Sequence, residues 1–516
     1  MSSGQASLAV GAIGLMLLAG SLAAPAMSLV PTAVVVPLGI VGATTVGPIA
    51  YYLWIGYQEA SAFATETSPL LGSRLTDAMG RNVARRLRAC LYVGRFFSAW
   101  GDRMWQFATP LLFMEIYKDT LLPSALFSLV VYVVGLVALP RIGRWLDATN
   151  RLSVLARSIA IENTCVVLST TSLASLLLVS SPAAAHILLA LTMLAGAIGQ
   201  VFNDAQALAI EKDWVVVVAA ATQTPLASWN TTLRRIDLTC ALLAPAVFGI
   251  LLDSSSADSA TRAAVGAAAV GTWNLLAAPL EYAMVRDVYA WVPTLSASTL
   301  KVTAAPASET LVAQWAAYTK HPTCLLSVSF CALYMTVLCG SGLNIAYLQW
   351  RGLPVSLLGA SAGLGALAGL VGTLVFPALE RSWGAAVVVL VSIWLFWLTL
   401  LPVGVSYIAF GETRTTDIVM VVAVTVSRAW LWMTDLAETQ LMQERVHESM
   451  RGAINAMQTA TSKIFYIAIL LLSVLCSDPA AFETLAFVSL GAVGSAALGM
   501  SIWFAAHGRS AATAST

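Results

Sequence analysis

The sequence predicts an all-α membrane protein that crosses the bilayer many times. Hydrophobic residues make up 59% of the 516 residues and charged residues only 10%, whereas a soluble domain carries roughly 25% charged residues. Apolar runs of about 20 residues, the length that spans a bilayer as a helix, recur along the chain. The net charge of +1 provides no basic surface for nucleic acid, so that class of partner is excluded.

Twelve apolar segments in two halves of six are expected to span the membrane. They are 91–117, 122–140, 155–178, 184–208, 238–253, 263–285, 323–346, 355–378, 384–404, 416–437, 453–475 and 481–505. The first six define an N-lobe over 91–285, and the last six a C-lobe over 323–505. The polar stretch 286–322 between them is predicted to be a cytosolic linker, and 506–516 a cytosolic tail.

Residues 1–90 are expected to form a hydrophobic extension followed by an Arg-rich cytosolic loop. Two apolar runs, 8–24 and 27–56, contain no charged residue, and we expect extra membrane segments or a re-entrant hairpin there. A cleaved signal peptide is the alternative, although its usual positive n-region is absent.

The distribution of Lys and Arg predicts the orientation. Connections on one side of the expected spans hold most of these residues, including the clusters at 74–88 and 141–157. The alternate connections hold only Lys118, Arg262, Arg351 and Arg414. Cytosolic loops carry the excess of positive charge, so both ends of the twelve-span body are predicted to be cytosolic.

Asp102 lies near the middle of the first expected span, followed directly by Arg103. A charge at bilayer depth is costly, and such residues usually face a cavity or a partner. Asp102 is therefore expected to serve a substrate path, although ion-paired scaffolding at helix ends is the alternative for any one such charge. Other charged residues near membrane depth are Glu115, Glu162, Asp204, Asp237, Glu281, Arg428, Asp435, Glu438 and Lys463.

Three further polar residues extend this pattern in the same half. Asn274 and Glu281 are two helical turns apart and share one helix face, and Glu162 lies within another apolar segment. With Asp102 they form an all-oxygen set, which suits hard divalent cations such as Ca²⁺ or Mn²⁺.

The predicted cytosolic connections carry opposite charges from both halves. Such charges are expected to pair across a closed gate, or else to be solvated loop charges. The acidic members include Asp147, Asp213 and Glu448, and the basic members Arg151 and Arg451.

Other classes of protein lack support. No P-loop, nucleotide fingerprint or His-bearing catalytic motif occurs, so we expect neither an enzyme nor an ATP-driven pump. The seven cysteines are scattered through apolar segments without paired spacing, which is typical of small buried side chains.

Several longer strings resemble the ferroportin family, the iron exporters of the major facilitator superfamily. The resemblance covers roughly 90–505 and implies two six-helix lobes, alternating access and Fe²⁺ export from the cytosol. An N-terminal extension makes the chain similar to organelle-type members rather than to the vertebrate proteins. The strings are Ser98–Trp105, Asp213–Val218, Leu233–Asp237, Trp273-Asn274, Leu333–Leu338, Thr439–Leu441 and Arg451-Gly452.

The resemblance also implies roles for individual residues. Asp102 matches the N-lobe metal aspartate, and Gln106 stands where the vertebrate proteins have histidine. The family's Ca²⁺ site matches Asp102, Glu162 (glutamine in the vertebrate proteins), Asn274 and Glu281. The cytosolic gate matches Arg151, Asp213, Asn230, Arg234, Glu448 and Arg451.

The C-lobe departs from the family pattern. The family's cysteine and histidine metal ligands in this lobe correspond to Gly342 and Ile469 here. Cys339 could replace the cysteine ligand, and the alternative is that it is a buried structural thiol. Lys463 in span eleven would repel a nearby cation. The same family cysteine binds the hormone hepcidin, so we expect no such regulation here.

Loss of these ligands bears on the substrate. Imidazole and thiolate help to select Fe²⁺ over Ca²⁺ and Mg²⁺, so we expect selectivity to extend to Mn²⁺, Co²⁺ or Ni²⁺. The alternative is a transporter of organic cations, polyamines or metal chelates from the same superfamily. We expect a monomer.

The expected location is the plasma membrane or an endomembrane. Glu66–Leu71 fits an acidic dileucine sorting pattern, which would direct the protein to a vacuole or lysosome-like membrane, although such short matches also occur by chance.

Overall fold

The computed structural model describes residues 81–117, 122–255, 258–297, 310–339, 342–353, 355–475 and 481–507. Secondary structure within these ranges is helical throughout, which confirms the predicted all-α class. The first 80 residues, with the dileucine pattern, lie outside the described residues, as do 298–309 of the linker and the tail from 508 onward.

Six long helices form the N-lobe. A π-helix, η2 (Leu208–Trp214), and the short helix α9 (Val215–Thr222) continue directly from the fourth of them. The long helices are α5 (Arg81–Ile116), α6 (Leu122–Ala148), α7 (Arg151–Ser175), α8 (Pro182–Ala207), α10 (Leu226–Ser255) and α11 (Ser259–Trp291).

The short helices α12 (Pro293–Ala297) and α13 (Leu311–Lys320) lie in the linker region. In the C-lobe a 3-10 turn, η4 (Glu448–Met450), precedes the eleventh expected span. The C-lobe helices are α14 (Cys324–Ala332), α15 (Gly342–Trp350), α16 (Val355–Trp383), α17 (Ala385–Phe410), α18 (Arg414–Arg445), α19 (Arg451–Leu475) and α20 (Phe482–His507).

The membrane-spanning character is confirmed for ten stretches of the described chain, which are long and apolar enough to cross a bilayer. The other two expected spans differ for physical reasons. The first, α5, carries Arg95, Asp102 and Arg103 along its length. The seventh is divided between the short helices α14 and α15 rather than forming one helix.

Local sequence explains several helix boundaries. Asn150 caps α7, its side-chain oxygen accepting hydrogen bonds from the backbone N–H groups of Leu152 and Ser153. Thr413 caps α18 in the same way through Thr416, as expected of residues whose side chains satisfy the free N–H groups of a first turn. Gln223, with φ of 49°, ends α9 in the left-handed region.

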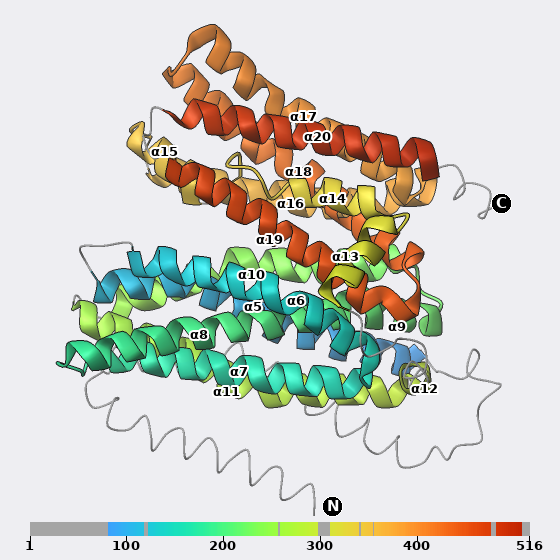
Figure 1. Cartoon of the computed structure of the whole chain (residues 1–516), viewed down its shortest axis with the longest axis horizontal. Coiled ribbons are helices and arrows are strands. Elements are labelled where there is room, and N and C mark those ends of the chain that lie inside the picture. The colour runs from blue at the N-terminus through green and yellow to red at the C-terminus, as the bar shows by residue number, and fades with distance from the viewer. Residues whose placement is uncertain are drawn as a thin grey trace, which may run out of the picture.

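The two lobes lie side by side, with the N-lobe helices in one half of Figure 1 and most C-lobe helices in the other. Helix α19 lies along the boundary and packs against α6, while α10 packs against α16 of the C-lobe. Each lobe has its own apolar core, that of the C-lobe including Phe376, Phe396 and Trp503.

Within the C-lobe, α16 and α18 approach closely at Gly372. A Cβ atom there would meet the backbone carbonyl of Ala429 on α18, and small residues permit such close contact between membrane helices. Backbone atoms cannot rotate away as a side chain can, so the contact requires glycine.

Gly372→Ala is expected to destabilise the protein by roughly 1–3 kcal/mol, the usual cost of overpacking a tight contact. The measurement is the thermal unfolding of purified protein in detergent. Gly363→Ala on the same helix is the matched control, because a Cβ there has nothing within 4 Å. Equal melting temperatures for the two variants would contradict the account.

Candidate functional site

A central cavity of about 710 Å³ lies between the two lobes. Its N-lobe wall comes from α5, α6, α8, η2 and α10, and its C-lobe wall mainly from α18 and α19. The lining is rich in charged groups, with Asp102, Asp204 and Asp237 on one side and Asp435 and Glu438 on the other. A cavity of this kind between helical lobes can take up a solute at mid-membrane depth.

Asp102 and Gln106, the predicted substrate-metal residues, both line this cavity from α5. The Asp102 carboxyl lies near the side chains of Glu162 and Asn203. Gln106 is exposed to the cavity, and its Oε1 accepts a hydrogen bond from Arg103 Nη1 at 3.2 Å. The two predicted ligands are thus one helical turn apart on the same wall.

The remaining oxygen-bearing residues of the predicted Ca²⁺ set surround the same part of α5. Glu162, Asn274 and Glu281 are each 5% exposed. Glu162 accepts a hydrogen bond from Gln206, and a Cβ at Gly101 would lie 3.4 Å from Asn274 Oδ1.

Glu281 lines a small pocket of about 20 Å³ behind the cavity. In the part of the chain that the structure describes, no three His, Cys, Asp or Glu side chains gather closely enough to hold a metal ion. The predicted Ca²⁺ residues are therefore neighbours, but they do not form a closed cage in this conformation.

Most acids of the cavity are ion-paired. Within the N-lobe, Asp237 pairs with Arg103 at 2.7 Å, and Glu211 with Arg95 at 2.8 Å. Two further pairs join the lobes. Arg234 Nη2 on α10 lies 2.7 Å from Asp435 Oδ2 on α18, and Lys463 Nζ on α19 lies 2.9 Å from Asp204 Oδ2 on α8.

The ammonium group of Lys463 contacts an aromatic ring as well as Asp204. Its ammonium lies 5.4 Å from the ring centroid of Tyr132, and that ring stacks on Tyr466 with centroids 4.3 Å apart. Its charge is therefore balanced by Asp204 and the aromatic face. Sequence reasoning identified Lys463 as a charge that repels metal but did not identify Asp204 as its partner.

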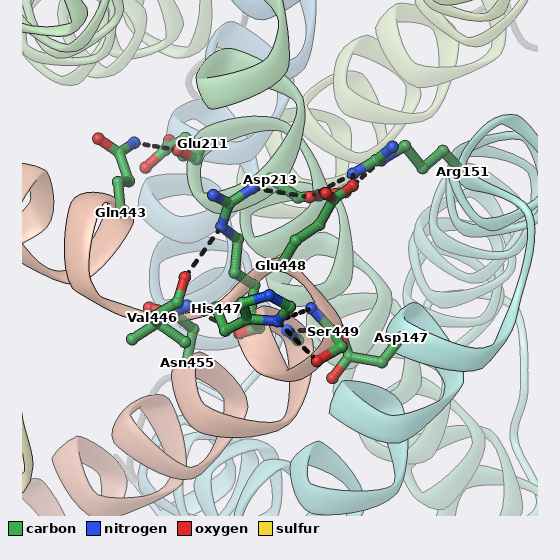
Figure 2. Close-up of polar contacts among 12 residues, drawn as sticks. Asp147, Arg151, Glu211, Asp213, Gln443, Val446, His447, Glu448, Ser449 and Asn455 are labelled. Carbon is green, nitrogen blue, oxygen red and sulfur yellow. Dashed lines mark hydrogen bonds and ion pairs between the residues drawn. The ribbon is translucent and has the colours of Figure 1, made fainter. Parts of the chain in front are cut away.

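A network of charges joins the two lobes on the side that is predicted to be cytosolic (Figure 2). Arg151 Nε lies 2.6 Å from Asp213 Oδ2, and Arg151 Nη2 lies 2.6 Å from Glu448 Oε1. Arg451 Nη1 lies 3.5 Å from Asp213 Oδ1. Four of the six predicted gate residues therefore meet, and they join α7 and η2 of the N-lobe to η4 and α19 of the C-lobe.

The other two predicted gate residues make separate contacts between the lobes. Asn230 Nδ2 donates to Gln443 Oε1 at 2.7 Å, and Arg234 pairs with Asp435 deeper in the cavity. Asp147 adds a cap, accepting hydrogen bonds from the backbone N–H groups of Gly452 at 2.8 Å and Ala453 at 2.7 Å. Its place among the opposite charges of the predicted cytosolic connections indicated this role in advance, whereas the sequence around Gln443 did not.

Comparison with known proteins now identifies the family. The sequence model described as Ferroportin1 matches residues 85–493 of this chain. The chain belongs to the ferroportin family.

Curated ferroportin relatives cover most of the chain. Solute carrier family 40 member 1 of Oryza sativa subsp. japonica is 31% identical over 451 residues, covering 81% of this chain and 91% of that protein. Ferroportin of Homo sapiens is 27% identical over 518 residues, covering 78% of this chain and 88% of that protein.

Solved structures agree on the fold. A bacterial homologue of the iron transporter ferroportin in an outward-facing state gives a TM-score of 0.72 at 23% identity, covering 81% of this chain and 99% of that chain. The major facilitator transporter FucP in the outward conformation gives 0.54 at 12% identity, covering 80% and 98%. The chain therefore has a major facilitator fold.

Around the C-lobe positions that were predicted to depart from the family pattern, the described residues include no cluster of metal ligands. Ile469 is 1% exposed in an apolar core, and Gly342 begins α15. Cys339 Sγ lies 3.7 Å from the Thr336 carbonyl oxygen. The guanidinium of Arg428 donates to the Leu338 carbonyl at 3.1 Å, so a fixed positive charge lies beside Cys339.

Arg151→Ala is expected to open the cytosolic side, because it removes the cation that joins Asp213 to Glu448. The measurement is labelling of a cavity cysteine, Thr439→Cys, by an impermeant maleimide in inside-out vesicles of a variant without native cysteines. We expect the labelling rate to rise about fivefold or more. This corresponds to a loss of about 1 kcal/mol from the free-energy difference that favours the closed gate.

Arg141→Ala provides the matched control for this experiment. Arg141 is also basic and near the cytosolic end of α6, but its Nη1 donates to Val137 of its own helix at 3.0 Å. The same labelling rate in Arg151→Ala as in the parent protein would show that the network does not hold the gate.

Proposed function

We propose that this protein exports Fe²⁺, and other divalent transition metals with it, from the cytosol by alternating access. The main support is the environment of Asp102. This residue lines the central cavity and has no ion-pair partner within 4 Å among the described residues. A carboxylate at bilayer depth without a fixed partner cation suits a transported cation. Membership of the ferroportin family supports iron as the principal substrate.

The gate and the charge pattern assign this conformation to one stage of the proposed export cycle. The Arg151–Asp213–Glu448 network closes the side that carries the excess of Lys and Arg, which is the cytosolic side. This conformation therefore corresponds to the stage that releases substrate outward. Separation of the network would expose Asp102 to the cytosol for loading.

Ligand chemistry argues for selectivity broader than iron. Asp102, Gln106 and Asn203 present oxygen donors on the N-lobe wall, and the family's C-lobe ligands are replaced by Gly342 and Ile469. Without imidazole or thiolate, preference for Fe²⁺ over harder divalent ions weakens. Mn²⁺, Co²⁺ and Ni²⁺ are the expected additional substrates.

A second candidate substrate is an organic cation, a polyamine or a metal chelate. The observation that favours it is the size of the cavity, about 710 Å³, with the stacked Tyr132 and Tyr466 rings on its wall. Aromatic faces bind organic cations, and this volume exceeds what one metal ion needs.

We propose that Ca²⁺ binds at a site formed by Asp102, Glu162, Asn274 and Glu281, either as a resident ion or as the coupling ion. Their burial around one segment of α5 supports this. The loss of the family cysteine at Gly342 supports transport without hepcidin-type regulation. We further propose that the protein acts as a monomer, because each lobe pair encloses its own cavity.

Asp102→Ala is expected to lower Fe²⁺ flux about tenfold or more, because removing a metal-site residue typically costs at least that factor. The measurement is uptake into proteoliposomes, with Co²⁺ and a polyamine as competitors. Glu115→Gln on the same helix is the matched control, since Glu115 pairs with Arg262 at 2.8 Å outside the cavity. If Fe²⁺ flux is the same in Asp102→Ala as in the wild type, the proposal that Asp102 binds a transported metal ion is wrong.

Glu281→Gln is expected to weaken Ca²⁺ binding about tenfold, since Ca²⁺ affinity depends on the number of ligand charges. Calorimetry of purified protein with Ca²⁺ measures this. Glu380→Gln is the control, because Glu380 accepts from Gln440 in the C-lobe, away from the proposed ions. Ca²⁺ affinity that Glu281→Gln leaves intact would remove Glu281 from the site.

A further inference from the structure

Glu438 is the second cavity acid without an ion pair. It lies on α18 and is fully buried, and its Oε1 accepts a hydrogen bond from Gln458 Nε2 at 2.6 Å. Its other oxygen, Oε2, has no hydrogen-bond partner, and no cation lies within 4 Å in the described part of the chain. Leaving a buried carboxylate oxygen unpaired is costly, so a cation or a proton bound at this atom would stabilise it.

The neighbours of Glu438 supply further oxygens. Asp435, Glu438 and Thr439 are three and four residues apart on α18, so they share one face of the helix. All three line the central cavity, and Gln458 and Ser462 of α19 line it beside them. Carboxylate, amide and hydroxyl oxygens together suit a divalent metal ion.

The remaining acids of the cavity are already neutralised. The pairs are Asp204 with Lys463, Asp237 with Arg103, Glu211 with Arg95 and Asp435 with Arg234. The carboxylates left for a transported cation are therefore Asp102 in the N-lobe and Glu438 in the C-lobe, one on each wall.

A cation of the opposite lobe approaches the Glu438 face in this conformation. Lys212 Nζ, on η2 of the N-lobe, donates to Thr439 Oγ1 at 2.9 Å, and Thr439 directly follows Glu438 in the chain. The next residue after Lys212 is Asp213 of the gate. Opening the gate must therefore withdraw Lys212 from α18 together with Asp213.

We propose that Glu438, with Thr439 and Gln458, forms a second cation subsite, which loads when the cytosolic gate opens and is emptied when Lys212 returns. An exporter needs tight binding when open to the cytosol and weak binding when open to the outside. The ammonium of Lys212 provides this difference, because a like charge brought near the site repels the bound ion. The inference rests on the proposed cation transport.

The test uses the full-length protein purified in detergent, with Co²⁺ as the air-stable probe and calorimetry as the readout. We expect two bound ions in the wild type, one in Asp102→Ala, one in Glu438→Gln and none in the double variant. Glu444→Gln is the matched control, because Glu444 is on the same helix but bonds to Gln440 and does not line the central cavity.

Lys212→Met separates a binding role from a structural one. Both variants are made in the Asp102→Ala background, which leaves the C-lobe subsite as the remaining Co²⁺ site. There Lys212→Met is expected to tighten Co²⁺ binding, and Glu438→Gln is expected to abolish Co²⁺ binding. Damage to the fold would weaken binding in both variants. Glu438→Asp is expected to restore part of the binding, since it keeps the carboxylate.

The outcomes are distinct. A single Co²⁺ ion in the wild type, or equal binding in the wild type and Glu438→Gln, overturns the C-lobe subsite and leaves export through Asp102 standing. Weaker binding in Lys212→Met overturns the role of Lys212 in release. Failure of wild-type vesicles to take up metal overturns the proposed function itself, which calorimetry does not measure.

Discussion

The arrangement of this protein depends on the cost of placing charge inside a bilayer. Each lobe carries buried acids and bases that its own side chains leave partly uncompensated, and the opposite lobe completes the pairing. Arg234 meets Asp435, Lys463 meets Asp204, and Arg151 meets Glu448. Separating the lobes would remove these partners, and for the two buried pairs it would do so in a medium of low dielectric. A transported cation can offset that cost only where an acid is otherwise without a partner.

The same constraint bears on the C-lobe, where the family's metal ligands are predicted to be replaced. At the break in span seven, Arg428 occupies the neighbourhood of Cys339 and donates to the Leu338 carbonyl. Ile469 contributes to an apolar core. Asp435 and Glu438 of α18 place the acidic side chains of this lobe that line the cavity on its opposite wall from Asp102.

Much of the fold was predictable, because the length and apolarity of a span are local properties of sequence. The position of Asp102 on the cavity wall was predictable for a related reason, since a charged residue within an apolar segment usually faces a cavity or a partner. The pairing of Lys463 with Asp204, and of Asn230 with Gln443, was not predictable, because it depends on how distant helices face each other. The division of span seven into α14 and α15 was missed because its apolar composition alone indicates one helix.

The π-helix η2 places three consecutive side chains in three different contacts. Glu211 reaches Arg95, Lys212 reaches Thr439, and Asp213 reaches Arg151. A π turn is held by one residue more per hydrogen-bonded ring than an α turn, so its register depends on the exact number of residues between α8 and α9. Insertions and deletions, which most loops of membrane proteins tolerate, would here displace all three contacts together. A substitution within η2 would therefore disturb one contact at a time, whereas a change of length would uncouple the cavity wall and the gate together.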